Sequence, residues 1–489
     1  MTNGIDGAPA QAPQVKDTER RTRDWILVAL ACTGQLIVVL DVSIVNVALP
    51  GIRGSLGFAE EDLQWVVTAY TLTFAGFMLI GGRAADLYGR RRVFVLSLVV
   101  FTLASLAGGL APNAIWLVAA RAVQGIGGAV LAPATLAILT AAFAEGPRRT
   151  QAIATWTMMG AVGGAIGAVL GGLLTEFFSW RWVLLVNVPV GLVLAVLALT
   201  YLTRDAERAA GRLDVLGGAT VTAGFLALVY GLVRFGKEAA FDAVGTGAVL
   251  IGIALLALFV VVEARVPHPL LPLRIVRQRA VAVANLTMFL LGAGFFSVLY
   301  FVSLYLQGVR ELSALAAGLV FVPFAVTTVI GAQSAARLLK RGTPPRLVII
   351  AGTALAALAF AALTPLDADS SIGWSVVVPG LVVFLGIGLA LAPTAATAIG
   401  GAAPQDAGVV SGLANATRQL GGSVGLAVLT IVAAARTRGD GTPDAQAITD
   451  GYTTAFAVAA VILVLAALSA ALLPGRPRTG TGPRAEESR

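Results

Sequence analysis

The stretch QLIVVLDVSIVNVALP, residues 35–50, places one carboxylate, Asp41, inside a segment that otherwise looks membrane-spanning. From Trp25 to Leu49 the chain contains no Lys, Arg, Glu or Pro, and Asp41 is the only charge. At the rise of an α-helix, this segment is long enough to cross a hydrocarbon core of ~30 Å. Because an ionisable group at that depth is costly to hold, we expect Asp41 to bind a proton, a cation or a partner charge. The alternative is an Asp that only faces a wet cleft.

The composition indicates an all-α polytopic membrane protein surrounded by the lipid bilayer. Hydrophobic residues make up 57% of the chain and charged residues 12%, whereas soluble domains carry about 25% charged residues. The net charge of +8 is a topology signal, because no basic cluster sits on a soluble domain that could follow phosphates. Nucleic acid is therefore not an expected partner. The single cysteine, Cys32, excludes an internal disulfide, and the single histidine, His268, leaves little material for a metal site.

Fourteen apolar stretches are long enough to be read as membrane-spanning helices. An even number places both termini on one side, and we expect that side to be the cytoplasm. Residues 1–24 are polar and basic near their end, without the apolar core and cleavage site of a signal peptide, so the first spanner should be retained. The stretches are 25–49, 63–81, 93–110, 114–142, 150–174, 182–201, 213–233, 243–262, 280–306, 313–336, 347–365, 373–399, 408–435 and 451–473.

The distribution of basic residues supports this topology. Most of the 34 Lys and Arg residues fall in the segments expected inside, and Arg121 and Arg418 fall within spanners. Such a bias is typical of cytoplasmic loops, and a miscount by one helix would destroy it. The sequence therefore predicts a multi-pass protein of the cell membrane with both termini in the cytoplasm.

The loop after the second spanner reads GRAADLYGRRR, residues 82–92. Its glycines permit a close turn and its arginines anchor the loop at the cytoplasmic face. The pattern formed by Gly82, Asp86, Gly89, Arg90 and Arg91 resembles the Gly-x-x-x-Asp-x-x-Gly-Arg-Arg signature of the major facilitator superfamily. This resemblance implies an inner gate, in which Asp86 and the arginines hold two helical bundles together when the cavity faces outward.

Other stretches resemble the fourteen-spanner drug/proton antiporter branch of that superfamily. They are LDVSIVNVALP (40–50), WVVTAYTL (65–72), RAVQGIGGAVLAP (121–133), WRWVLLVNVPVG (180–191) and SGLANATRQLGG (411–422). The resemblance implies a major facilitator fold with two six-helix bundles, 25–201 and 277–473. A linker with two extra transmembrane helices, 202–276, would join them, and polar cytoplasmic tails, 1–24 and 474–489, would flank them. We expect the inserted pair to be peripheral and structural.

The fifth spanner is the most glycine-rich helix of the chain. Glycines that recur every four residues let two helix backbones approach closely, so close packing is expected, with direct substrate contact as the alternative. The segment resembles the antiporter motif of the same family, but Gly164 and Ala168 stand where that motif often carries proline, so a less kinked helix is expected. The packing glycines are Gly160, Gly163, Gly164, Gly167, Gly171 and Gly172.

Depth along the helices predicts that Asp41 and Arg121 can meet. Each lies about 8 residues from the expected outer end of its spanner, or ~12 Å below the outer boundary. A conformational change that alters their separation or wetting would change the proton affinity of Asp41. The resemblance also implies a functional acid in the first helix and a functional Arg in the fourth, so we expect this pair to couple transport to protons.

The few polar groups within the spanners predict a mainly apolar substrate cavity. The leading hypothesis is proton-driven export of lipophilic small molecules such as drugs and antibiotics, by a monomer that uses the proton gradient and no cofactor. The alternatives are proton symport or facilitated uptake of a small polar metabolite, and a membrane enzyme or assembly subunit, for which no plausible nucleophile and base pair is present.

One carboxylate at depth favours neutral, zwitterionic or weakly acidic cargo over dications, with lipophilic monocations as lesser substrates. The candidate cavity residues are Gln35, Asn46, Tyr70, Trp156, Asn285, Tyr300, Asn415 and Arg418, and interhelical hydrogen bonds are the alternative role for Gln35 and Asn285.

Overall fold

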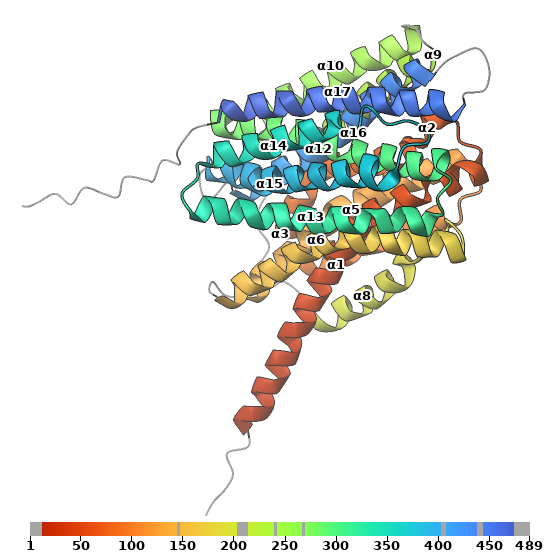
Figure 1. Ribbon diagram of the computed structural model, residues 1–489. Helices are drawn as coiled ribbons and strands as arrows, with labels where there is room; N and C mark the ends of the chain where they lie inside the picture. The colour runs from red at the N-terminus through yellow and green to blue at the C-terminus, as the bar shows by residue number, and fades with distance from the viewer. Residues whose placement is uncertain are drawn as a thin grey trace, which may run out of the picture.

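The computed structural model describes residues 12–143, 147–202, 214–238, 242–266, 269–401, 407–437 and 444–473, and these residues form helices joined by short loops, with no strand (Figure 1). The first group of helices is α1 (Ala12–Leu56), α2 (Glu60–Leu63), α3 (Trp65–Tyr88), α4 (Arg90–Gly109), α5 (Ala114–Ala142), α6 (Pro147–Phe177), α7 (Trp182–Leu185) and α8 (Asn187–Tyr201). The inserted pair is α9 (Val215–Glu238) and α10 (Ala243–Arg265), followed by the short α11 (Leu273–Val276). The second group is α12 (Arg279–Leu304), η1 (Tyr305–Val309), α13 (Ala314–Lys340), α14 (Pro345–Ala361), η2 (Ile372–Val377), α15 (Val378–Gly400), α16 (Ala407–Thr437) and α17 (Ala445–Ala471).

The all-helical membrane class predicted from composition is confirmed. Within the described residues, 11 helices are long and apolar enough to cross a membrane. Three shorter apolar helices, Trp65–Met78, Ile166–Phe177 and Pro345–Ala361, overlap the remaining three predicted stretches, 63–81, 150–174 and 347–365. The count of fourteen spanning helices therefore stays a prediction.

Helix α1 begins earlier than the apolar pattern indicates. It is already helical at Ala12, within the segment expected to be a polar tail, and it continues through Pro50 to Leu56. Residues 12–24 include one Lys, one Glu and three Arg, which are good helix formers, so an apolar spanner can extend into them without a break. Figure 1 shows this part of α1 projecting from the bundle. The predicted C-terminal tail, 474–489, lies outside the described residues.

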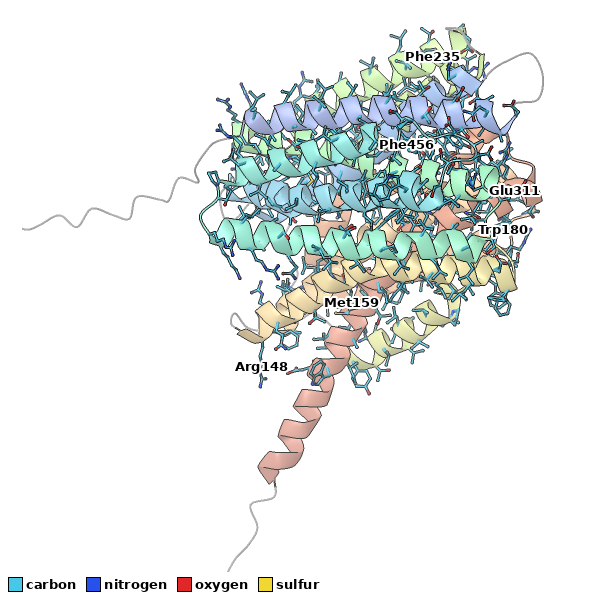
Figure 2. All side chains as sticks on the ribbon, viewed as in Figure 1. Arg148, Met159, Trp180, Phe235, Glu311 and Phe456 are labelled. Atoms are coloured by element: carbon cyan, nitrogen blue, oxygen red, sulfur yellow. The ribbon has the colours of Figure 1, made fainter. Side chains whose placement is uncertain are left out.

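The molecule has two ends, which we call the terminal end, where α17 finishes, and the far end. Trp180 and Glu311 lie at the far end and Arg148 at the terminal end (Figure 2). At the far end the first and the second group of helices, which we call the two bundles, touch. A Cβ atom on Gly172 of α6 would lie 2.8 Å from the carbonyl oxygen of Ala314 in α13. Toward the terminal end, α6 and α13 diverge (Figure 1).

Hydrogen bonds across the bundles are also concentrated in the far half. Ser303 Oγ of α12 donates to the backbone oxygen of Asn46 at 2.9 Å, and Gln307 Nε2 of η1 donates to that of Val47 at 3.0 Å. The hydroxyls of Thr71 in α3 and Ser423 in α16 are 2.6 Å apart. The bundles are therefore joined at the far end and separate toward the terminal end.

Helix α9 packs across the junction of the two bundles, whereas α10 forms an outer layer. Val229 and Val233 of α9 share a buried cluster with Leu72 of α3 and Ala427 of α16. Only 17% of the most apolar segment of α10 is buried inside the protein. At the far end, Arg234 Nε donates to Asp242 Oδ2 at 2.5 Å, and this hydrogen bond lowers the pKa of Asp242. Of the two inserted helices, only α10 is therefore peripheral as expected, whereas α9 is not.

Candidate functional site

The Asp41 carboxylate lies at the centre of a buried polar network inside the first bundle. Its side chain is 0% exposed, and that of Arg121 is 1% exposed. Arg121 Nη1 on α5 donates to Asp41 Oδ2 at 2.5 Å. The pairing of Asp41 with Arg121 that depth along the helices predicted is therefore present.

Three further polar side chains complete the network. Gln124 Nε2, one helical turn after Arg121, donates to Asp41 Oδ1 at 2.7 Å, and Asn187 Nδ2 on α8 donates to the same oxygen at 3.1 Å. Ser105 Oγ on α4 accepts from both amides at 3.0 Å and donates to the backbone oxygen of Leu184 at 2.9 Å. Each carboxylate oxygen of Asp41 thus accepts at least one hydrogen bond from another side chain.

The Arg121 guanidinium has three further partners besides Asp41. Its Nη1 also donates to Gln124 Oε1 at 2.8 Å, and its Nε donates to the backbone oxygen of Val66 at 3.0 Å. The carbon at the centre of the guanidinium lies 4.3 Å from the centroid of the Tyr70 ring, a cation–π contact. A buried ion pair that is hydrogen-bonded in this way holds its charges in place, and removing either partner would leave the other buried and unpaired.

Sequence reasoning found Asp41 and Arg121 but missed Gln124, Ser105 and Asn187. Gln124 and Asn187 lie in the quoted stretches RAVQGIGG and LLVNVPVG, where an amide inside an apolar spanner was the available signal. Ser105 carried no signal, because serine occurs throughout the spanners and its partner lies on another helix.

A cavity of about 320 Å³ lies between the two bundles, beside this network. Helix α1 separates the two, since Gln35, Val38 and Val42 line the cavity while Asp41 points to the other side. From the second bundle, Phe295, Phe321, Phe324, Phe384 and Arg418 contribute to the lining, with Thr328, Asn415 and Gln419 as further polar groups. The lining contains no carboxylate among the residues that the structure describes.

The structure sorts the predicted cavity residues into two groups. Gln35, Asn415 and Arg418 line the cavity. The others are used elsewhere among the described helices: Asn46 Nδ2 donates to the Val42 oxygen at 2.7 Å, Tyr70 packs on Arg121, Trp156 Nε1 donates to Thr135 Oγ1 at 2.9 Å, Tyr300 is buried in the second bundle, and Asn285 Nδ2 donates to the Val281 oxygen at 2.8 Å. For this second group the expectation of a cavity position is not met, because their side chains turn toward neighbouring helices or their own backbone.

The glycines of α6 bring it against α1. A Cβ atom on Gly167 would lie 2.8 Å from the Leu40 oxygen, and one on Gly171 would lie 2.7 Å from the Ile44 oxygen. Gly163 faces Leu36 and Val39 of the same helix, whereas Gly172 faces α13. Gly164 differs, since a Cβ there would meet nothing within 4 Å. The surroundings of Gly160 lie outside the described part of the structure.

The loop between α3 and α4 turns at Gly89, whose φ of 92° is a conformation that side chains rarely adopt. Arg91 donates to the Leu199 oxygen of α8 at 2.7 Å, and Arg83 donates to the Pro269 oxygen of the linker at 2.9 Å. Arg90 is half-buried. Of the predicted gate, Gly82 and the Asp86 side chain lie outside the described part.

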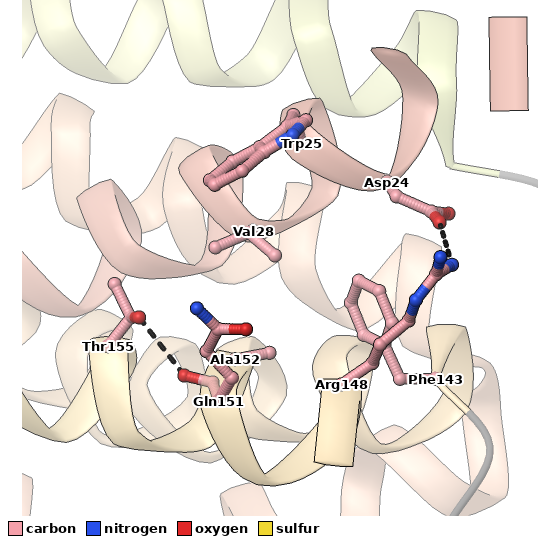
Figure 3. Close-up of a pocket in the computed structure, with 8 residues that line it drawn as sticks. All are labelled: Asp24, Trp25, Val28, Phe143, Arg148, Gln151, Ala152 and Thr155. Carbon is pink, nitrogen blue, oxygen red and sulfur yellow. Dashed lines mark hydrogen bonds and ion pairs between the residues drawn. The ribbon is translucent and has the colours of Figure 1, made fainter. Parts of the chain in front are cut away.

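A second pocket, of about 260 Å³, opens at the terminal end between α1 and α6 (Figure 3). Asp24 and Arg148 face each other across it at 4.0 Å, and the Arg148 side chain is 73% exposed. An ion pair this exposed contributes little to stability, and the pocket holds no buried charge.

Comparison with known proteins agrees with this architecture. Residues 31–426 match the model of the Major Facilitator Superfamily. The cephamycin export protein CmcT of Amycolatopsis lactamdurans is 43% identical, covering 94% of this chain and 95% of that protein. The puromycin resistance protein pur8 of Streptomyces alboniger is 37% identical over 97% and 99%, and the lincomycin resistance protein of Streptomyces lincolnensis is 33% identical over 96% and 95%.

Solved structures show the same fold at low sequence identity. A bacterial homologue of the human lysosomal transporter Spinster superposes with a TM-score of 0.63 at 18% identity, covering 92% of this chain and 97% of that one. The nucleoside transporter NupG superposes with a TM-score of 0.65 at 13% identity.

Proposed function

Because this chain belongs to the Major Facilitator Superfamily, we propose that it exports lipophilic small molecules, antibiotics among them, across the cell membrane in exchange for protons. The chain is a transporter and not an enzyme, and transporters of this type need no cofactor. Relatives named for antibiotic export or resistance support the direction of transport.

The observation that carries the proposal is the buried pairing of Asp41 with Arg121 beside a mainly apolar cavity. The cavity accepts lipophilic cargo, and the carboxylate accepts one proton. The carboxylate of Asp41 faces one opposite charge, Arg121, and two amide donors, Gln124 and Asn187.

We place the terminal end in the cytoplasm, in accordance with the bias of basic residues. The cavity then faces inward, and the contacts at the far end close it to the outside. Two of these contacts reach α1 directly, since Ser303 and Gln307 bind the backbone oxygens of Asn46 and Val47. Asn46 and Val47 lie about one and a half helical turns from Asp41.

This connection provides a physical route for coupling. Opening the far end must break the contacts at Asn46 and Val47, which frees the outer half of α1. Water then reaches Asp41, its bonds to Arg121 and the amides loosen, and it takes up a proton from outside. When the far end closes again, the network reforms around the carboxylate and the proton leaves inward. The protein therefore alternates access to substrate and proton within a monomer.

A transport experiment on Asp41→Asn tests the proposal. Cells that lack other pumps and express the wild type should accumulate less N-phenyl-1-naphthylamine, a neutral lipophilic dye, and an uncoupler should abolish the difference. In proteoliposomes, Asp41→Asn should retain exchange of substrate across the membrane without a gradient, but lose accumulation driven by a pH gradient. Asp369→Asn, which changes an exposed carboxylate, is the matched control. Gradient-driven accumulation by Asp41→Asn would refute the role of Asp41.

A further inference from the structure

Among the residues that the structure describes, the cavity contains a cation without a counter-ion. Arg418 of α16 donates through Nη2 to Asn415 Oδ1 at 3.0 Å, one turn earlier on the same helix. The carbon at the centre of its guanidinium lies 5.8 Å from the centroid of the Phe295 ring. Within the described part of the chain, no carboxylate lies within 4.0 Å of Arg418, and none lines the cavity.

The contrast with Arg121 shows that helix packing does not explain Arg418. Arg121 is matched by a carboxylate, a backbone oxygen on a neighbouring helix and a side-chain amide. Arg418 bonds only a neutral side chain of its own helix, among the described residues. A guanidinium in such surroundings is incompletely compensated for the loss of water, so it favours an anion that enters the cavity.

Two hydrogen-bond acceptors in the same cavity also lack donors. Gln35 Oε1 on α1 and Gln419 Oε1 on α16 are buried and accept no hydrogen bond from the described residues. Both side chains line the cavity, and Gln419 is only 4% exposed. A buried amide oxygen without a donor costs free energy, and a ligand that carries an N–H or O–H group removes that cost.

The remaining wall is aromatic. The rings of Phe324 and Phe384 stack with centroids 5.1 Å apart, and Phe295 meets Phe384 edge to face at 5.9 Å. These rings offer flat apolar surface to a ligand next to the guanidinium. The volume of about 320 Å³ is at the lower end of the range for drug-sized ligands.

We propose that the cavity selects lipophilic monoanions, with the anionic group on Arg418, an N–H or O–H donor directed at Gln35 or Gln419, and an aromatic body against the phenylalanines. This inference rests on the proposed efflux function and names its substrate class. Arg418 can bind a carboxylate through two parallel hydrogen bonds, a geometry for which the guanidinium is suited. A cation in the same position would face the like charge of Arg418 without a compensating carboxylate.

Three dansyl compounds of matched size test the charge preference. Dansylglycine is a monoanion, dansylglycinamide is neutral and dansylethylenediamine is a monocation, and all three carry the same aromatic group and sulfonamide N–H. Their dissociation constants are measured by fluorescence with the protein in nanodiscs and no ion gradient. The wild type should bind the anion about ten-fold more tightly than the amide, as expected for one hydrogen-bonded charge pair, and the cation most weakly.

Variants assign the preference to Arg418. Arg418→Gln should bring the anion-to-amide ratio close to one, chiefly by weakening binding of the anion, and Arg418→Lys should keep part of the ratio. Arg337→Gln removes an equal charge from the exposed end of α13, outside the cavity, and should leave the ratio unchanged. Gln419→Leu should weaken all three compounds and preserve the ratio.

Equal affinities for the anion and the amide in the wild type would overturn the inference, and so would a ratio that survives Arg418→Gln. If Arg418→Gln does not fold, Arg418→Leu takes its place, and an anion-to-amide ratio that this variant retains in full would overturn the inference. A wild-type order in which the cation binds most tightly would also overturn it. Because the assay uses no gradient, its failure leaves proton-driven dye export standing. Conversely, a loss of export activity in the transport assay leaves the binding order measurable.

Discussion

The buried Asp41–Arg121 pair predicts strong energetic coupling between its two members. Asp41→Asn preserves the shape of the side chain but leaves the Arg121 guanidinium, 1% exposed, without a counter-charge. Breaking such a pair costs about 3–5 kcal/mol of unfolding free energy. Arg121→Gln should reduce the unfolding free energy by about 3 kcal/mol, the lower end of this range, because Gln124 and Asn187 still donate to the carboxylate.

The double variant should be less destabilised than the sum of the single variants. With both charges removed, the site holds only neutral polar groups, so we expect a coupling energy of about 2–3 kcal/mol. The measurement is unfolding in mixed micelles, followed by tryptophan fluorescence, for the wild type, both single variants and the double variant.

The Arg234–Asp242 pair supplies a matched control. Its side chains are 32% and 22% exposed, although its 2.5 Å separation equals that of the buried pair. The corresponding cycle should give a coupling of about 0–1 kcal/mol, because water screens the pair. Additive effects of Asp41→Asn and Arg121→Gln, within about 0.5 kcal/mol, would refute the assignment of a buried ion pair. Restored stability without restored proton coupling in the double variant would separate the structural role of the pair from its proposed transport role.

Three further predictions concern the packing of α6, the contacts at the far end and the predicted inner gate. Gly167→Val should destabilise the protein by about 1–3 kcal/mol, because the valine side chain would strike the backbone of α1. In the control Gly164→Ala, the added methyl group meets nothing within 4 Å and should leave the melting temperature unchanged, so equal melting temperatures for the two variants would contradict the packing argument. Combined Ser303→Ala and Gln307→Leu should favour opening of the far end by about 1–3 kcal/mol through loss of two hydrogen bonds to α1, measured as distances between spin labels. Thr353→Ala, whose hydroxyl bonds within its own helix, is the control, and unchanged distances in the double variant would show that these two contacts do not hold the far end closed. Asp86→Ala should favour the inward-facing state and slow transport without abolishing substrate binding, and unchanged accessibility of cysteines introduced at the terminal end would count against an inner gate.

The helical membrane class could be predicted from the sequence, because a bilayer accepts few other structures and because apolar length is read directly from the chain. The meeting of Asp41 and Arg121 was also predictable, since depth follows from the constant rise per residue of a helix. The glycine stripe of α6 predicted a close approach, and Gly167 and Gly171 make it against α1. In each case the controlling quantity is measured along a single helix.

What the sequence by itself could not decide is the direction in which a side chain points around its helix. Most spanners here are apolar on all sides, so no polar stripe distinguishes a face toward the cavity from a face toward another helix. For that reason Asn415 and Arg418 line the cavity while Asn46 and Tyr300 do not, and Gln124 and Asn187 emerged only when α5 and α8 were placed beside α1. The sequence determined the depth and the charge of the functional groups, and only the packing of helices from distant parts of the chain decided which of them meet.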